Sequence, residues 1–141
     1  MNSRQGLNSW NNRAKKGGCD MAYLDKEIVV VDDDQGILES FDAMLGDDYA
    51  LVTLNNGFAA IEYVKSHKPR LIFLDIKMPG MNGIEVLKKL RQDKVEVAVV
   101  MVTATSQAHY ESEAEDLGIT AYLRKPFEID EVEDITKRVL H

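Results

Sequence analysis

Short, uninterrupted runs of apolar residues alternate along most of the chain with segments whose apolar residues recur every three or four positions. Uninterrupted runs are typical of strands buried on both faces, and the longer spacing is typical of helices that rest on a sheet. The pattern predicts strands at Ile28–Val31, Tyr49–Leu54, Leu71–Leu74, Val95–Val102 and Ala121–Leu123, with helices at Gly36–Leu45, Phe58–His67, Gly83–Gln92, Gln107–Leu117 and Ile129–Leu140.

Strands and helices in strict alternation predict an α/β fold, a parallel sheet with helices on both faces. A chain of 141 residues is long enough for one such domain. Residues 1–22 do not follow the pattern, because they are rich in Asn, Ser and Gly and carry only scattered apolar residues such as Trp10. We interpret them as a disordered N-terminal extension or a remnant of cloning, not a secretory signal, and place the folded domain at 23–141.

The composition limits the classes of partner. The chain has 24 acidic and 17 basic residues, a formal net charge of −7, and four of the basic residues lie in the first 22 positions. Such an acidic domain does not favour direct binding to nucleic acid, but it suits Mg²⁺ and basic protein surfaces. The single cysteine excludes an intramolecular disulfide, and no apolar run is long enough to cross a membrane.

Polar side chains follow four of the five predicted strands. The run Asp32–Asp34 follows the first strand, Asp75 the third, Thr103 the fourth and Lys125 the fifth. Because the carboxyl ends of parallel strands meet at one edge of a sheet, these groups are expected to lie close together. Carboxylates at the edge of a core must be solvated, paired or bound to metal, so an acidic pocket there needs a cation. We interpret Asp34 as a residue at the start of a helix and not as a ligand.

This set of groups suits phosphoryl transfer. A carboxylate can attack a phosphoryl donor and become an acyl phosphate. Mg²⁺ reduces the repulsion between the carboxylate and the phosphoryl oxygens, and it prefers oxygen ligands. A lysine and a hydroxyl can then hold the phosphoryl group, and Lys125 and Thr103 are groups of those types.

Four motifs at these strand ends give the chain a family resemblance. They are Val30–Asp34, Leu74–Gly83, Val102–Ala104 and Lys125–Phe127. In this order, and over residues 27–141, the chain resembles the CheY-like receiver domain of two-component response regulators. The resemblance implies a doubly wound sheet with the strand order 2-1-3-4-5.

The resemblance also implies a role for each acidic residue. Asp75 would be the phosphoryl acceptor, and Mg²⁺, for which Mn²⁺ can substitute, would be held by Asp32, Asp33, Asp75 and the backbone carbonyl of Lys77. Asp33 would bind the ion directly, and Asp32 largely through water. The side chains at Lys77 and Thr105 would border the attacking water and so tune the lifetime of the phosphoryl group.

The remaining motif residues would hold the phosphoryl group and transmit its presence. Thr103 and Lys125 would bind phosphoryl oxygens, and the Lys125–Pro126 peptide bond would be cis. Thr103 and Tyr122 would form a switch in which the aromatic ring turns inward as the threonine moves. Ala104 is small, as access to the pocket requires.

The resemblance further implies a cytoplasmic signalling module that catalyses only its own phosphorylation and dephosphorylation, with no direct nucleic-acid or membrane partner. A sensor histidine kinase or phosphotransfer protein would be the donor, and a downstream protein or an effector domain would read the result. The predicted fourth helix has few apolar anchors and many acidic residues, so it is weakly held. We therefore expect the face formed by the fourth helix, fifth strand and fifth helix to switch, and it is also a candidate surface for a homodimer.

Three other interpretations fit the sequence less well. A phosphatase of the haloacid dehalogenase type needs a second aspartate two residues after the nucleophile, where this chain has Lys77. A flavodoxin-like cofactor-binding protein needs a phosphate-binding loop after the first strand, where the run Asp32–Asp34 repels phosphate. An adaptor that signals without phosphorylation would not need the full set of acidic, hydroxyl and lysine groups.

Overall fold

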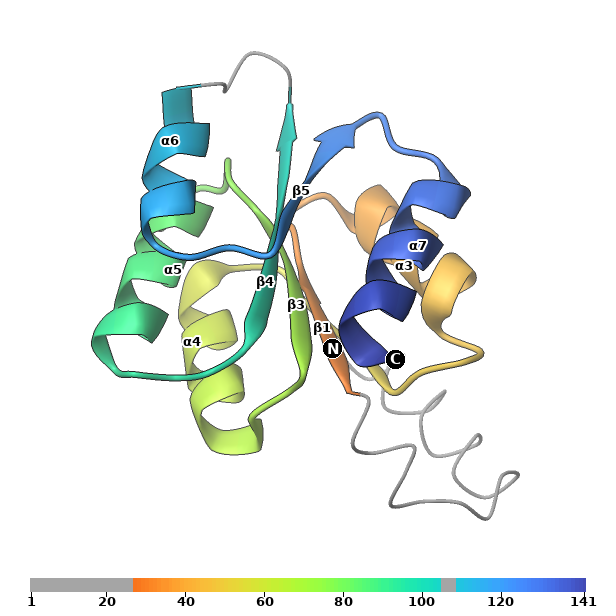
Figure 1. Cartoon of the computed structure of the whole chain (residues 1–141), viewed down its shortest axis with the longest axis horizontal. Coiled ribbons are helices and arrows are strands. Elements are labelled where there is room, and N and C mark those ends of the chain that lie inside the picture. The colour runs from red at the N-terminus through yellow and green to blue at the C-terminus, as the bar shows by residue number, and fades with distance from the viewer. Residues whose placement is uncertain (1–26, 105–108) are drawn as a thin grey trace.

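A five-stranded parallel sheet forms the centre of the molecule (Figure 1). The computed structural model describes residues 27–104 and 109–141. The strands lie in the order β2-β1-β3-β4-β5, which confirms the predicted order. The elements are β1 (Ile28–Val31), α3 (Gln35–Leu45), β2 (Leu51–Leu54), α4 (Gly57–His67), β3 (Leu71–Asp75), α5 (Gly83–Gln92), β4 (Ala98–Ala104), α6 (His109–Asp116), β5 (Ala121–Lys125) and α7 (Ile129–Leu140).

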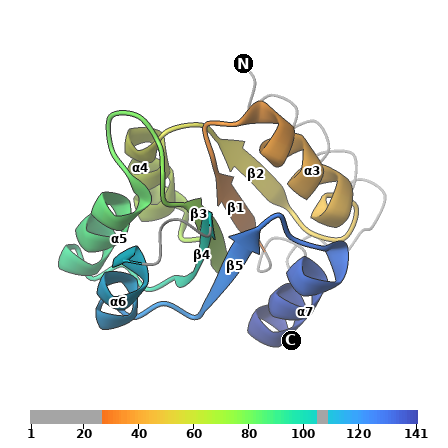
Figure 2. The same cartoon turned by 90° about the horizontal axis from the view of Figure 1, so that it is seen from above.

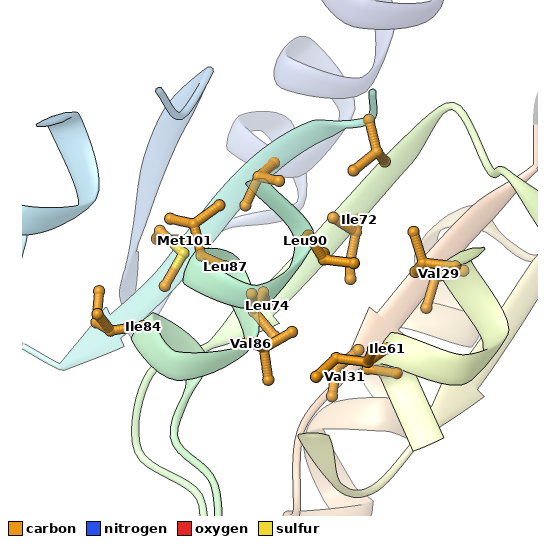
Figure 3. Close-up of a cluster of buried hydrophobic side chains, with 14 of the residues drawn as sticks. Val29, Val31, Ile61, Ile72, Leu74, Ile84, Val86, Leu87, Leu90 and Met101 are labelled. Atoms are coloured by element: carbon orange, nitrogen blue, oxygen red, sulfur yellow. The ribbon is translucent and has the colours of Figure 1, made fainter. Parts of the chain in front are cut away.

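Helices cover both faces of the sheet, with α3 and α7 on one face and α4, α5 and α6 on the other (Figure 2). Each face has its own apolar core, because alternate residues of a strand point in opposite directions. In β3, for example, Ile72 and Leu74 join the core under α4 and α5, whereas Leu71 and Phe73 join the core under α3 and α7. Figure 3 shows the first of these cores, where side chains from α4 and α5 meet those of the central strands.

The observed strands begin later than the sequence predicts at two places. β2 begins at Leu51 instead of Tyr49, because the N–H of Tyr49 bonds back to the end of α3. β4 begins at Ala98 instead of Val95, because the Val95 carbonyl accepts a hydrogen bond from Arg91 and belongs to a loop. In both cases a local hydrogen bond takes a backbone group that the sheet would otherwise use.

Some predictions concern residues that the structure does not describe. The fourth helix, expected at Gln107–Leu117, is observed as α6 from His109, and residues 105–108 lie outside the described part. Thr105 is among them, as are the proposed extension 1–22 and the domain boundary at residue 23. Among the helices of the described ranges, none is long and apolar enough to span a lipid bilayer.

Side-chain caps fix two of the loops at the carboxyl edge of the sheet. Asp34 accepts a hydrogen bond from the Gly36 N–H at 2.9 Å and caps α3, in agreement with its interpretation as a helix-starting residue. Asn82 and Glu85 form a reciprocal capping box at the start of α5. These caps define the ends of the loops after β1 and β3, where the acidic residues lie.

The start of α5 approaches the end of β3 very closely at Gly83. Its N–H donates to the carbonyl of Ile76 at 2.7 Å, and a Cβ at this position would lie 2.3 Å from the backbone oxygen of Asp75. A side chain does not fit at that separation, so glycine is required here for space. The contact holds the backbone of Asp75 against the first turn of α5.

Candidate functional site

Three carboxylates meet at the carboxyl edge of the sheet, where two adjacent strands end. Asp32 and Asp33 follow β1, and Asp75 is the last residue of the neighbouring β3. Each contributes an oxygen that lies within 4.8 Å of the others. Asp32 and Asp75 are only 1% and 4% exposed, whereas Asp33 is exposed. The structure therefore forms the acidic pocket that the sequence predicts.

Lys125 bridges the two buried carboxylates. Its Nζ atom lies 3.0 Å from Oδ2 of Asp32 and 3.2 Å from Oδ1 of Asp75. The lysine ends β5, and the peptide bond that joins it to Pro126 is cis, as expected. One ammonium group thus faces two buried carboxylates, and Asp33 adds a third at the surface.

Burial dominates the electrostatics of this cluster. It raises the pKa of Asp75 from 3.8 to about 6, and the charges of Asp32 and Asp33 add to the rise while Lys125 opposes it. Burial also raises the pKa of Asp32, against hydrogen bonds from the Asp34 N–H and from Lys125. The pKa of Lys125 is raised in spite of its burial, because both buried carboxylates favour its charged form. The cluster is therefore short of positive charge.

The donor set of the cluster fits a hard divalent cation. Mg²⁺ prefers oxygen ligands and usually combines one or two carboxylates with retained waters. Asp33 is exposed. Asp32, in contrast, accepts a hydrogen bond from the backbone N–H of Asp34 at Oδ1, at 2.9 Å, and pairs with Lys125 through Oδ2. Lys77 lies in the loop between β3 and α5 with its side chain exposed. A cation here would supply the positive charge that the cluster lacks.

Thr103 is buried near the end of β4, the strand that pairs with β3. The register places Asp75 opposite Val102, so Thr103 lies one residue further toward the same edge. Its hydroxyl donates to the carbonyl of Ala104 at 3.0 Å. The fourth predicted side chain therefore lies at the edge that carries the acidic cluster, with its hydroxyl bonded to the backbone of its own strand.

Tyr122 lies on the α6 side of β5, where its ring is half-buried and its O–H donates to the backbone carbonyl of Glu111 in α6. Arg124, two residues further along β5, pairs with the Glu111 carboxylate at 2.6 Å. The sequence prediction singled out Tyr122 but missed Arg124 and Glu111. Residues two apart on a strand face the same way, which was a partial signal, but the sequence does not position α6 against β5.

Comparison with known proteins identifies the family. The model of the response regulator receiver domain matches residues 28–137, and the chain belongs to this family. Sporulation initiation phosphotransferase F of Bacillus subtilis (strain 168) is 33% identical over 118 residues, which cover 83% of this chain and 95% of that protein. The alkaline phosphatase synthesis transcriptional regulatory protein PhoP of the same strain is 35% identical over 118 residues, 83% of this chain but 49% of PhoP. The chain thus spans about half of the second relative.

A solved structure supports the same assignment. A CheY-like response regulator receiver domain from Methanospirillum hungatei JF-1 matches with a TM-score of 0.76 and 27% identity, covering 82% of this chain and 93% of that one. The fold and the family define a receiver domain, a signalling domain of two-component phosphorelays. Domains of this family generally bind Mg²⁺, and the family implies a histidine kinase or phosphotransfer protein as a partner.

Proposed function

We propose that Asp75 of this receiver domain accepts a phosphoryl group from a phosphohistidine of a sensor kinase or phosphotransfer protein. The observation that best supports the assignment is the bridge from Lys125 to Asp32 and Asp75 within a group of three carboxylates. Both oxygens of Asp32 are engaged, one by the backbone N–H of Asp34 and one by Lys125. Asp33 is exposed at the rim. Asp75, at the end of a central strand, is therefore the best-placed nucleophile.

In the proposed step, a carboxylate oxygen of Asp75 attacks phosphorus, and the bond between phosphorus and the histidine nitrogen breaks. The electron pair of that bond returns to the imidazole, and Asp75 becomes an acyl phosphate. A pKa of about 6 means that part of the acceptor is protonated in mildly acidic solution without a cation. Since the protonated carboxyl is a poor nucleophile, the reaction needs positive charge in the pocket.

We assign that charge to Mg²⁺, for which Mn²⁺ can substitute. Asp33 would bind it directly and Asp32 through water, with Asp75 and the backbone carbonyl of Lys77 completing the protein ligands. The exposure of Asp33 and the engagement of both Asp32 oxygens support this division. The ion, when bound, reduces the repulsion between the carboxylate and the phosphoryl oxygens.

Lys125 and Thr103 would hold the phosphoryl group once it has been transferred. The ammonium of Lys125 already lies 3.2 Å from Asp75, so it can pair with a phosphoryl oxygen there. The Thr103 hydroxyl would exchange its bond to the Ala104 carbonyl for a bond to another phosphoryl oxygen. These two exchanges would draw the ends of β4 and β5 toward the acceptor and start the conformational change.

We further propose that the chain catalyses only its own phosphorylation and the hydrolysis of its acyl phosphate. Water would attack the phosphorus, the bond between phosphorus and the Asp75 oxygen would break, and inorganic phosphate and the Asp75 carboxylate would be the products. The exposed side chain of Lys77 follows the acceptor by two residues, so it would border the path of that water and tune the lifetime of the phosphorylated form.

The output face in this proposal is formed by α6, β5 and α7. Of the α6 side chains that the structure describes, only Ala114 is fully buried and Tyr110 packs partly buried against the same core, so little apolar area holds this helix to the sheet. A change at Thr103 and Lys125 can therefore shift α6, and a downstream protein, an effector domain or a second copy of the chain would read the altered face. Hydrogen exchange over 107–123, with and without beryllofluoride, tests the shift, and unchanged protection would contradict it.

Intact mass after incubation with acetyl phosphate tests the acceptor assignment. We expect one added phosphoryl group in the native protein with Mg²⁺, and none with a chelator or in Asp75→Asn. Asp130→Asn, at an exposed carboxylate in the first turn of α7, controls for a general loss of charge and should behave as native. An adduct in Asp75→Asn, or one that forms without a divalent cation, would contradict the proposal.

A further inference from the structure

The helix α6 is attached by polar contacts at its two ends. At its C-terminal end, the Arg91 guanidinium of α5 donates to the carbonyls of Leu117 at 3.0 Å and Gly118 at 2.7 Å. The same group donates to the carbonyls of Val95 at 3.2 Å and Val97 at 3.3 Å in the loop before β4. Four carbonyls on one planar guanidinium form a rigid anchor, because a single displacement would break several bonds at once.

The other end of α6 is attached to β5 through Glu111. The Tyr122 hydroxyl donates to its backbone carbonyl, and the Arg124 guanidinium lies 2.6 Å from its Oε2 atom. This Oε2 atom is buried and has no hydrogen-bond partner among the described residues. The ion pair with Arg124 is therefore what compensates the charge at this atom, and the oxygen would gain from a second arrangement that exposes it to water.

The strand β5 connects this attachment to the acidic pocket. Arg124 is followed directly by Lys125, whose ammonium bridges Asp32 and Asp75. Successive strand residues point to opposite sides of a sheet. Arg124 therefore contacts α6 while the next residue, Lys125, contacts Asp75. A shift of β5 that follows Lys125 toward a phosphoryl group must also move the guanidinium of Arg124 relative to Glu111.

We infer that Glu111, held by Arg124 and Tyr122, is a latch that keeps the first turn of α6 on β5 while Lys125 pairs with Asp32 and Asp75. Phosphorylation of Asp75 breaks these contacts of Glu111, and α6 pivots about its C-terminal end, which Arg91 keeps fixed. The inference rests on the proposed function of Asp75. An ion pair made in only one of two arrangements biases the equilibrium toward that arrangement, so its removal must favour the other.

The test compares variants that remove the latch with one that removes a different contact of the same helix. Arg124→Gln and Glu111→Gln each abolish the ion pair. Lys88→Gln abolishes the 2.7 Å pair between Lys88 of α5 and Glu113 of α6, which does not involve β5. Beryllofluoride mimics the phosphoryl group on Asp75. Its affinity in the presence of Mg²⁺, measured by calorimetry on the full chain, therefore reports how readily the chain adopts the phosphorylated arrangement.

We expect each latch variant to bind beryllofluoride about threefold to tenfold more tightly than the native protein, because a ligand gains affinity when the competing arrangement is weakened. The double variant should gain no more than about the larger single effect, since both substitutions remove the same pair. Lys88→Gln should match the native affinity. Unchanged or weaker binding in Arg124→Gln and Glu111→Gln, or an equal gain in Lys88→Gln, would overturn the latch.

A second measurement separates this inference from the acceptor assignment. Without any phosphoryl mimic, amide exchange in the peptide 109–117 should be faster in Arg124→Gln than in the native protein and unchanged in the region 28–75. Equal exchange in 109–117 would overturn the latch whatever happens at Asp75. A native protein that binds no beryllofluoride would instead contradict the acceptor assignment, on which the release step depends.

Discussion

At Asp75, the proposed chemistry and the stability of the folded protein favour opposite ionisation states of the carboxyl group. The residue is 4% exposed and its carboxyl group shares a pocket with two other carboxylates, so burial and like charge raise its pKa to about 6. A group of that kind is costly to ionise in the folded state, and Lys125 offsets only part of the cost. The proposed nucleophile must be ionised, whereas folding favours the protonated form of this side chain.

The stability of the metal-free protein should therefore depend on the ionisation of Asp75. An aspartate whose pKa is raised from 3.8 to about 6 binds its proton more tightly when folded, so folding loses free energy as the pH rises between those values. We expect Asp75→Asn to be more stable than the native protein by about 1–3 kcal/mol at pH 8, and by much less at pH 4. Urea unfolding with a chelator at both pH values measures the difference.

Glu96→Gln is the matched control, because this carboxylate is exposed in the loop before β4. Its stability should follow that of the native protein at both pH values. An Asp75→Asn advantage that is larger at pH 4 than at pH 8 would show that the sign of the assigned pKa shift is wrong.

At the scale of elements, the site depends on how tightly the start of α5 meets the end of β3. The meeting point is Gly83, where a Cβ would lie 2.3 Å from the Asp75 backbone oxygen and 2.9 Å from the Cα of Ile76. Both neighbouring atoms belong to the backbone, so they cannot move aside as a flexible side chain would. The position of Asp75, the proposed acceptor, is thus set by the contact between α5 and β3 and not by its own side chain.

Gly83→Ala should consequently destabilise the fold by about 2–4 kcal/mol, because the added methyl group forces α5 away from β3. Gly36→Ala is the control, since its Cβ would meet only the Asp34 carboxylate at 3.2 Å and lies at an exposed helix start. That variant should change stability by less than about 1 kcal/mol. Urea unfolding compares the two, and equal losses would contradict the importance of the close contact.

The sequence predicted the strands and the edge that carries the site, but not how α6 lies against β5. Strand identity, strand order and the edge that carries Asp32, Asp75 and Lys125 followed from apolar runs, acidic strand ends and the family motifs, since those signals are local. The ion pair between Arg124 and Glu111 was missed, because it depends on how α6 lies against β5. That placement is set by packing between distant segments, which hydrophobic periodicity does not contain.

At the scale of the whole molecule, the acidic pocket sits within a chain whose formal net charge is −7. A cation bound in the pocket relieves local repulsion and binds the folded state alone, since the three carboxylates meet only when β1 and β3 pair. Metal binding should therefore be visible as global stability. Any salt would also stabilise the fold by screening the acidic surface. A test must therefore separate specific binding of Mg²⁺ in the pocket from this general screening.

Mg²⁺ at one hundred times its Kd should raise the melting temperature by about 10 °C, because a ligand at that concentration adds about 2.7 kcal/mol to the stability. NaCl at the same ionic strength should produce a smaller rise. In Asp33→Asn the two salts should act alike, since the variant lacks the exposed carboxylate proposed as the direct ligand. Thermal unfolding followed by circular dichroism measures these shifts. If Mg²⁺ raises the melting temperature of Asp33→Asn as much as that of the native protein, Asp33 is not a ligand of the ion.

The most direct test of the central claim is to locate the phosphoryl group by chemistry. An aspartyl phosphate is reduced by borohydride to homoserine, which peptide mass spectrometry assigns to a single position. After incubation with acetyl phosphate and Mg²⁺, we expect homoserine at position 75 and at no other aspartate. Homoserine at Asp32 or Asp33, or none when the intact mass shows an adduct, would contradict the assignment of Asp75 as the phosphoryl acceptor.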